Sequence, residues 1–231
     1  MKDNIITIDG PSASGKGTLA RNIADFLGFE ILDSGLLYRV YAFLFESGLK
    51  HSQIPASIKN DVSFKSDKEG IVVLNKNIDI TAKLRDESTA IAASKISSLL
   101  ETRENLLTIQ RNFYSPAGLV ADGRDMGTVV FPDAKLKIFL IASPEIRAKR
   151  RQLELQNRGQ EVNMHALIED IKQRDLKDQT RELSPLVPAD DSVLIDSSDM
   201  SPEEVLSFTK KLAKKEFNKW QNRLPLYLMK V

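Results

Sequence analysis

A glycine-rich stretch near the start of the chain carries the residue types that bind phosphate. Residues 10–18 read Gly-Pro-Ser-Ala-Ser-Gly-Lys-Gly-Thr, between an apolar run at residues 5–8 and a helical pattern at residues 19–27. Glycines let backbone amides curl around phosphate oxygens, and the following helix N-terminus adds aligned N–H groups. Lys16 contributes a mobile positive charge that can reach the outer phosphates. A strand, this loop and a helix together predict a nucleotide phosphate site.

The residue after Lys16 departs from the usual phosphate-loop pattern, in which Ser or Thr binds magnesium. Here that position is Gly17, and Thr18 follows it. The Gly-Lys-Gly-Thr ending resembles that of nucleoside monophosphate kinases and argues against switch GTPases. Thr18, directly or through water, is therefore the hydroxyl expected at a magnesium ion.

Two further polar segments follow apolar runs. Residues 33–35 (Asp-Ser-Gly) come after the run at 29–32, and residues 122–125 (Asp-Gly-Arg-Asp) come after the run at 118–121. Ligands of open α/β sheets collect at the carboxyl ends of parallel strands. The first segment alone is as consistent with a turn as with a site. The second is the stronger candidate, with a solvated salt bridge as its alternative. Arg39 offers a bidentate phosphate contact nearby.

Clustered charges mark the second half of the chain. Five basic residues straddle a helical pattern and Gly159: Arg147, Lys149, Arg150, Arg151 and Arg158. Two interpretations stay open, a solvated helix face or a mobile lid that brings cations to transferring phosphates. Farther on, the spacing of Arg174, Asp178 and Arg181 predicts that all three share one helix face. They are as consistent with a surface ladder of ion pairs as with a site.

The order of elements predicts a doubly wound α/β fold. Buried strands are expected at residues 5–8, 29–32, 118–121, 136–141 and 192–195. From about residue 51 to residue 84 the pattern changes to short strands separated by turns, which predicts an inserted antiparallel meander. Its strands are expected at residues 62–65, 70–74 and 78–80.

Helix boundaries are indicated by capping residues. Gly28 is expected to end the helix after the phosphate loop, and Ser143, Asn163 and Ser201 to begin later ones. Helices are also expected at residues 86–97 and 98–114, with Ser98 and Glu101 as a capping box that starts the second.

Composition restricts the classes of function. The chain has 231 residues, a net charge of +1 and 42% hydrophobic residues, which gives no reason to expect nucleic acid or an anionic membrane as partner. Without cysteine and with two histidines, it has no disulfides, thiolate metal sites or multi-histidine centres. No signal peptide or membrane-spanning run is recognised, so a cytoplasmic location is expected.

Over nearly all its length the chain resembles the bacterial cytidylate kinases. The most specific segment is residues 121–132, Ala-Asp-Gly-Arg-Asp-Met-Gly-Thr-Val-Val-Phe-Pro. The remaining matches are residues 8–18, residues 32–35 with Tyr38 and Arg39, Arg174 with Arg181, and residues 185–188 (Pro-Leu-Val-Pro). The resemblance implies a P-loop NTPase fold, with a five-stranded parallel sheet flanked by helices. It places the core at residues 1–33 and 115–231, a lid at about 147–162, and a monophosphate-binding region at 34–114 that includes the antiparallel insertion at about 60–82.

The resemblance also implies the reaction and the residues that perform it. ATP, with Mg²⁺, would phosphorylate CMP and dCMP, and the catalytic residues would be Lys16, Arg124 and Arg181. The ATP contacts would be Gly10, Pro11, Ser12, Ala13, Ser14, Gly15, Lys16, Gly17, Thr18, Arg150 and Arg151. Arg39, Arg124 and Arg181 would hold the CMP phosphate; Ser94, Arg103 and Asp125 would read the cytosine; Ser34, Arg174 and Asp178 would lie near the sugar. Because Ser94 and Arg103 are nine residues apart, this assignment requires the helix break at Ser98.

Two other functions and one structural question remain. A kinase for UMP or shikimate, or a non-catalytic nucleotide-binding regulator, would share the phosphate loop. A monomer is expected, although the segment after Lys215 departs from the family and is apolar. Docking of this tail on the chain's own surface is favoured over a contact with a partner. The tail contains Phe217, Trp220, Leu224, Pro225, Leu226, Tyr227, Leu228 and Met229.

Overall fold

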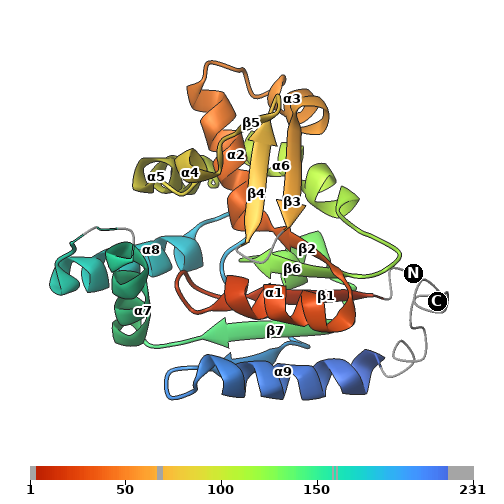
Figure 1. Cartoon of the computed structure of the whole chain (residues 1–231), viewed down its shortest axis with the longest axis vertical. Helices are drawn as coiled ribbons and strands as arrows, with labels where there is room; N and C mark the ends of the chain where they lie inside the picture. The colour runs from red at the N-terminus through yellow and green to blue at the C-terminus, as the bar shows by residue number, and fades with distance from the viewer. Residues whose placement is uncertain (1–3, 67–69, 158, 160, 218–231) are drawn as a thin grey trace, which may run out of the picture.

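The computed structural model describes residues 4–66, 70–157, 159 and 161–217. Its central sheet consists of β1 (Ile5–Asp9), β2 (Glu30–Asp33), β6 (Leu119–Gly123), β7 (Leu136–Ile141) and β8 (Val193–Asp196). The strand order is β2-β6-β1-β7-β8, and every neighbouring pair is parallel. In Figure 1 this sheet lies across the middle of the molecule, with an insertion above it and two helices to its left. The predicted five-stranded parallel sheet is confirmed.

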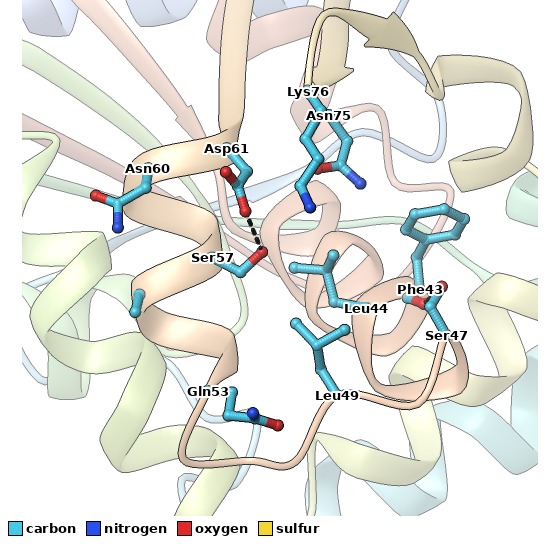
Figure 2. A pocket seen from close by; sticks show the side chains of 11 residues that line it. Phe43, Leu44, Ser47, Leu49, Gln53, Ser57, Asn60, Asp61, Asn75 and Lys76 are labelled. Atoms are coloured by element: carbon cyan, nitrogen blue, oxygen red, sulfur yellow. Dashed lines mark hydrogen bonds between the residues drawn. The ribbon is translucent and has the colours of Figure 1, made fainter.

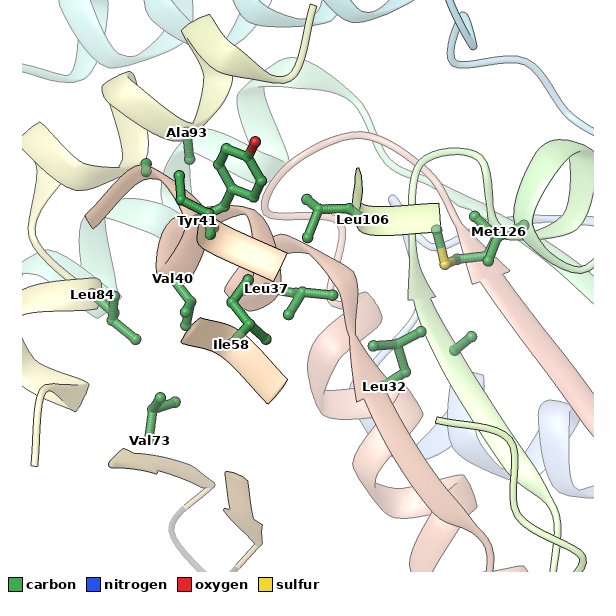
Figure 3. Close-up of a cluster of buried hydrophobic side chains, with 14 of the residues drawn as sticks. Leu32, Leu37, Val40, Tyr41, Ile58, Val73, Leu84, Ala93, Leu106 and Met126 are labelled. Carbon is green, nitrogen blue, oxygen red and sulfur yellow. The ribbon is translucent and has the colours of Figure 1, made fainter. Parts of the chain in front are cut away.

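Helices cover both faces of the sheet, because successive strand side chains point in opposite directions. These helices are α1 (Lys16–Leu27), α2 (Ser34–Glu46), α6 (Leu100–Asn112) and α9 (Pro202–Phe217). On one face, Ile6 and Ile8 of β1 belong to an apolar cluster with α1 and α9. On the other face, Ile5 joins a cluster that extends through α2 and α6 into the insertion. Figure 3 shows part of this second cluster, with Leu32 on β2 of the sheet and Val73 on β4 of the insertion.

The insertion contains the predicted antiparallel meander and two helices that were not predicted. Its elements are α3 (Ile54–Asp61), β3 (Val62–Ser66), β4 (Ile71–Asn75), β5 (Ile78–Asp79) and α4 (Thr81–Leu84). The interpretation of residues 51–84 as strands and turns alone is therefore wrong. Ile54 and Ile58 are buried one turn apart, but a segment of eight residues with two large apolar side chains is too short to show helical periodicity.

The predicted helix break near Ser98 is present, but the capping box is not. Helix α5 (Glu87–Ile96) ends before α6 begins, and Leu99 precedes α6 without a side-chain cap. The Ser98 hydroxyl donates instead to the carbonyl of Lys95 at 2.8 Å, at the end of α5. The same Ser-x-x-Glu spacing does form a capping box at α9, where Ser201 and Glu204 exchange hydrogen bonds of 2.8 and 3.2 Å. A serine that directly follows one helix can donate to a free carbonyl at the end of that helix instead of capping the N-terminus of the next.

The last two helices to be introduced are α7 (Pro144–Gln156) and α8 (Met164–Thr180). Their predicted caps are confirmed, because Ser143 and Asn163 accept from the backbone N–H groups of Ile146 and Ala166 at 3.3 and 3.2 Å. Helix α8 ends at Thr180, and Arg181 has extended backbone angles. The prediction that Arg181 shares a helix face with Arg174 and Asp178 is therefore wrong.

Most of the apolar tail lies outside the described residues. Its first residue, Phe217, is 2% exposed and packs edge-to-face on Phe29, with ring centroids 5.6 Å apart. Among the helices that the structure describes, each is too short or too polar to cross a bilayer.

Candidate active site

The candidate residues meet where the parallel strands end. Strand β6 lies between β1 and β2, with Gly123 in register with Asp9, and Asp122 in register with Asp33. The phosphate loop after β1, Ser34 after β2 and Arg124 after β6 therefore lie at one edge of the sheet, as the sequence predicts.

The phosphate loop is shaped by glycine and folds around its own lysine. At Gly10, φ is +148° and an added Cβ would lie 2.0 Å from the carbonyl oxygen of Leu140, so no side chain fits. Lys16 is 6% exposed, and its Nζ donates to the carbonyl of Pro11 at 2.8 Å. The Ser14 hydroxyl is buried and has no hydrogen-bond partner among the described residues. The loop thus places an ammonium group and a free hydroxyl where phosphate oxygens are expected.

Two buried carboxylates lie close to Lys16. Asp9 accepts hydrogen bonds from the backbone N–H groups of Met126 and Gly127 at 2.8 and 2.7 Å. Burial nevertheless raises the pKa of Asp9 to about 6. Burial also raises the pKa of Asp122, whereas burial and the charge of Arg124 lower the pKa of Lys16. The two hydrogen bonds of Asp9 tie the phosphate loop to the start of a π-helix, Met126–Val130.

Gly17 leaves room for a carboxylate beside the loop. An added Cβ at Gly17 would lie 3.3 Å from Oδ2 of Asp122, while Thr18 next to it is exposed. Carboxylate oxygens are preferred ligands of magnesium. Sequence reasoning assigned Asp122 no role of its own, although it opens the Asp-Gly-Arg-Asp segment. Sequence alone could not show that Asp122 lies beside the glycine that replaces the usual hydroxyl, because Gly17 belongs to α1 and Asp122 to β6, far apart along the chain.

Arginines and Asp178 form the next part of the site. Nε of Arg124 lies 3.0 Å from Oδ2 of Asp178, and Nη1 of Arg181 lies 3.8 Å from Oδ1 of the same carboxylate. Burial would raise the pKa of Asp178, but the neighbouring arginines outweigh it and lower the pKa. Burial, with the charge of Arg124, lowers the pKa of Arg174 to about 10, so it stays cationic at neutral pH. Arg124 and Arg181 therefore approach the same carboxylate, Arg181 from just beyond the end of α8.

Arg103 and Asp125 form a second buried pair. Nη1 of Arg103 lies 2.9 Å from Oδ2 of Asp125, and its guanidinium stands 5.9 Å from the ring centroid of Tyr38. Burial raises the pKa of Tyr38 to about 12, so the phenol remains neutral. Arg39, on the same helix as Tyr38, donates to the carbonyl of Leu84 at 2.8 Å.

The two predicted serines have different surroundings. Ser34 is 3% exposed, and its hydroxyl accepts from Nε2 of Gln110 at 2.9 Å. Ser94 is contacted by Nζ of Lys177, which lies 3.2 Å from its carbonyl and 3.5 Å from its hydroxyl. The structure therefore brings Arg103 to Asp125, but places Ser94 against α8. Sequence reasoning missed Gln110, whose one signal is its helical spacing of seven residues from Arg103.

Two arginines of α7 lie against the phosphate loop. Arg147 is 3% exposed, pairs with Asp175 of α8 at 2.9 Å and donates to the carbonyl of Ser12 at 3.4 Å. Arg150 donates to the carbonyl of Ser14 at 2.9 Å and also binds the turn after β8. For Arg147 the solvated helix face is therefore the wrong interpretation.

The other basic residues of this cluster differ from one another. Arg151 reaches across to Glu87 of α5, with 2.7 Å between Nη2 and Oε2. Lys149 is exposed, and Arg158 lies outside the described residues. A cavity of about 580 Å³ lies elsewhere, between α2 and the insertion, where Phe43, Leu44 and Lys76 contribute to its wall (Figure 2). None of its lining residues is a candidate site residue.

Comparison with known proteins gives one consistent family. A family model described as cytidylate kinase matches residues 6–215. The cytidylate kinase of Photobacterium profundum is 46% identical over 209 residues, covering 87% of this chain and 90% of that protein. The cytidylate kinase of Proteus mirabilis is 42% identical over 222 residues, covering 93% and 97%. Among solved structures, TT1252 from Thermus thermophilus aligns with 93% of this chain and 98% of its own, at 15% identity and a TM-score of 0.47. On the family match and these identities, the chain belongs to the cytidylate kinase family.

Proposed function

We propose that this protein transfers the terminal phosphoryl group of ATP to CMP and dCMP. The observation that carries the proposal is the meeting, at one sheet edge, of a phosphate loop with two buried arginine–carboxylate pairs, Arg124–Asp178 and Arg103–Asp125. The relatives named cytidylate kinase support the same reaction.

The phosphate loop would hold the donor. Incoming phosphate oxygens would replace the carbonyl of Pro11 as acceptors for Nζ of Lys16. Their negative charge would also oppose the lowering of the Lys16 pKa by burial, and so keep the ammonium protonated during transfer. The buried Ser14 hydroxyl and the N-terminus of α1 supply further donors.

The acceptor needs little activation. A monophosphate is largely ionised at neutral pH, so no strong general base is required. Catalysis then consists of positioning and charge neutralisation. Arg39, Arg124 and Arg181 would neutralise the two phosphates, and Arg181 would stabilise the group in transfer. The lid proposed at about residues 147–162, which includes most of α7, would exclude water that could otherwise hydrolyse ATP.

Base selection would rest on Asp125 and Arg103. A carboxylate accepts from the amino group that cytosine has and uracil lacks, and a guanidinium donates to ring acceptors. The pair would separate to receive the base, so uracil would leave the carboxylate unpaired in a buried site. Ser94 would have to leave Lys177 to take part.

Magnesium fits the residues beside the loop. Mg²⁺ keeps several waters and uses one or two carboxylates with substrate phosphates, and no group of three acidic or histidine side chains is found among the described residues to cage it. Asp122 beside Gly17 would hold the ion with its waters, and Thr18 is the second candidate. When bound, the ion supplies neutralisation of phosphate charge.

The same proposal takes the enzyme to be a cytoplasmic monomer, with residues 34–114 as the monophosphate-binding region. Light scattering of the full chain and of a chain ending at Lys215 tests the oligomeric state. If the full and the shortened chain form assemblies with the same number of subunits, the tail is not a self-association surface.

An ADP-release assay with ATP and magnesium tests the reaction, with CMP, dCMP, UMP, AMP and GMP run side by side. Fast turnover with CMP and dCMP alone is expected. Turnover with another monophosphate would retain the kinase but overturn the roles of Asp125 and Arg103. Failure with all five, from folded protein that binds ATP, would overturn the proposal.

A further inference from the structure

Helix α5 makes polar contacts with both α7 and α8, which lie below it on the left of Figure 1. At the start of α5, Oε2 of Glu87 lies 2.7 Å from Nη2 of Arg151 on α7. Seven residues further along α5, the carbonyl of Ser94 accepts from Nζ of Lys177 on α8 at 3.2 Å. Ile91 lies between these two contacts along α5 and is 64% exposed. This side of α5 is therefore held to α7 and α8 by polar contacts.

The three arginines of α7 have different kinds of partner. Arg147 and Arg150 donate to backbone carbonyls of the phosphate loop. Arg151 donates instead to two carboxylates, Glu87 across the gap between helices and Glu154 on its own helix. Among the described residues, Arg151 makes no hydrogen bond or ion pair with the phosphate loop. The resemblance implies an ATP contact for Arg151, but its partners direct it toward the region that would bind the monophosphate.

The contact between Glu87 and Arg151 joins two parts of the candidate CMP site. Ser94 belongs to α5, whereas Arg174 and Asp178 belong to α8. The charge of Glu87 also acts on Arg174, where it opposes the lowering of the Arg174 pKa by burial and by Arg124. The spacing between α5 and the α7–α8 pair therefore determines whether these residues can reach the same nucleotide.

We propose that Glu87 is a positioning residue which, through Arg151, holds α5 against α7 so that the CMP-binding residues of α5 and α8 lie close together. This assigns Arg151 to the closing of the acceptor site rather than to ATP. The Glu87 side chain is 60% exposed, so the pair can open for substrate exchange. Exposed ion pairs are weak, and the loss of one shifts such an equilibrium by at most about fivefold. The inference rests on the proposed CMP kinase function.

Glu87→Gln is the first test, because it removes the charge and keeps the size of the side chain. We expect the KM for CMP to rise about two- to fivefold, with kcat and the KM for ATP unchanged, since the ATP contacts do not depend on α5. Glu154→Gln is the matched control: it removes the other carboxylate partner of Arg151 but no contact between helices, and should leave the KM for CMP unchanged. Equal effects of the two variants would overturn the inference.

A double-mutant cycle tests whether Glu87 acts through Arg151. Arg151→Gln should raise the KM for CMP by the same factor, and Glu87→Gln should add no further rise in that background. Calorimetry should show unchanged ATP affinity for Arg151→Gln and weaker ATP binding for Arg150→Gln, which removes a contact with the loop. Equal losses of ATP affinity in these two variants would overturn the assignment of Arg151, as would a rise in the KM for CMP that Glu87→Gln causes without Arg151.

A distance measurement tests the same contact without turnover. The chain has no cysteine, so spin labels at Lys95→Cys on α5 and Lys149→Cys on α7, both exposed positions, report the spacing of these helices alone. Glu87→Gln should lengthen and broaden the distance distribution, whereas Glu154→Gln should not. An unchanged distribution in Glu87→Gln would overturn the inference. Lack of CMP turnover by folded wild-type protein would instead overturn the proposed function, whatever the distances show.

Discussion

The part of the site that would bind ATP (the donor side) and the part that would bind CMP (the acceptor side) place their charged groups in different surroundings. Around the phosphate loop, Lys16 donates to a carbonyl, and Asp9 is held by two backbone N–H groups. On the acceptor side, Asp125 and Asp178 are each within 3.0 Å of an arginine nitrogen. Burial therefore dominates on the donor side and shifts Asp9 and Lys16 toward their neutral forms, whereas charge pairing lowers the pKa of Asp178.

This difference determines what each ligand has to do. The phosphates of ATP entering the loop would favour the protonated form of Lys16, whose pKa burial has lowered, and no ion pair would have to separate. On the acceptor side the arginines would instead leave their carboxylate partners to bind CMP. Part of the binding energy of CMP would therefore be used to separate two buried ion pairs. Function at the donor side should therefore depend mainly on the Lys16 ammonium and on pH. Function at the acceptor side should depend on both members of each arginine–carboxylate pair.

The largest effect is expected from Lys16→Met. Loss of the ammonium removes a positive charge placed at the transferring phosphates, and kcat should fall about a thousandfold. Among the described residues Lys16 donates a hydrogen bond to the loop and none to the acceptor pairs, although it feels the charge of Arg124, so CMP affinity measured by calorimetry should change much less than kcat. Lys149→Met removes an exposed lysine of α7 and is the matched control. Turnover near the wild-type value would contradict the division between the two sides.

Asp9→Asn tests the role of burial on the donor side. Burial raises the pKa of Asp9 from an ordinary value of 3.8 to about 6, so above pH 6 the charged carboxylate destabilises the folded state by about 3 kcal/mol. Between pH 6 and pH 4 the folded state takes up the proton first, and this penalty disappears as the pH falls. Denaturant unfolding of both proteins at pH 4, 5, 6 and 7 should show wild type gaining stability relative to the variant on acidification.

A control of opposite sign is available on the surface. Hydrogen bonds from Ser198 lower the pKa of Asp196, so Asp196→Asn should remove a contribution that wild type loses on acidification. If the free energies of unfolding of wild type and Asp9→Asn changed with pH in parallel, burial would not raise the pKa of Asp9.

Arg181→Ala tests charge pairing at the transferring phosphate. The Arg181 guanidinium lies near Asp178, and among the described residues it makes no hydrogen bond or ion pair with the phosphate loop. We therefore expect kcat to fall about a hundredfold, while ATP affinity changes less. Steady-state kinetics combined with ATP titration give both quantities. A loss confined to ATP affinity would place Arg181 on the donor side.

The smallest effect is expected from Asp125→Asn. The amide keeps the shape but leaves the Arg103 guanidinium without its charge partner, and kcat/KM for CMP should fall about tenfold. Discrimination against UMP should fall with it, because an amide can donate to the uracil oxygen. The ratio of kcat/KM for CMP and UMP measures this. An unchanged ratio would remove Asp125 from base selection.

The amino-acid sequence by itself determined the local features. The phosphate loop, the caps Ser143 and Asn163 and the five strands follow from residue types over a few positions, because glycine conformations, capping and short apolar runs are local features. Predictions weakened where two short-range choices competed. Ser98 satisfied the helix behind it, and α3 was too short to show a period.

Tertiary structure alone decided which polar groups became partners. Arg124 meets Asp178 across 54 residues, Ser34 meets Gln110 across 76, and Asp9 meets Met126 across 117. No local pattern encodes such pairs, because they depend on which helix and strand ends pack together. The depth of burial that shifts Asp9 and Lys16 toward neutrality is likewise a property of the assembled sheet edge, since desolvation requires all the surrounding elements at once.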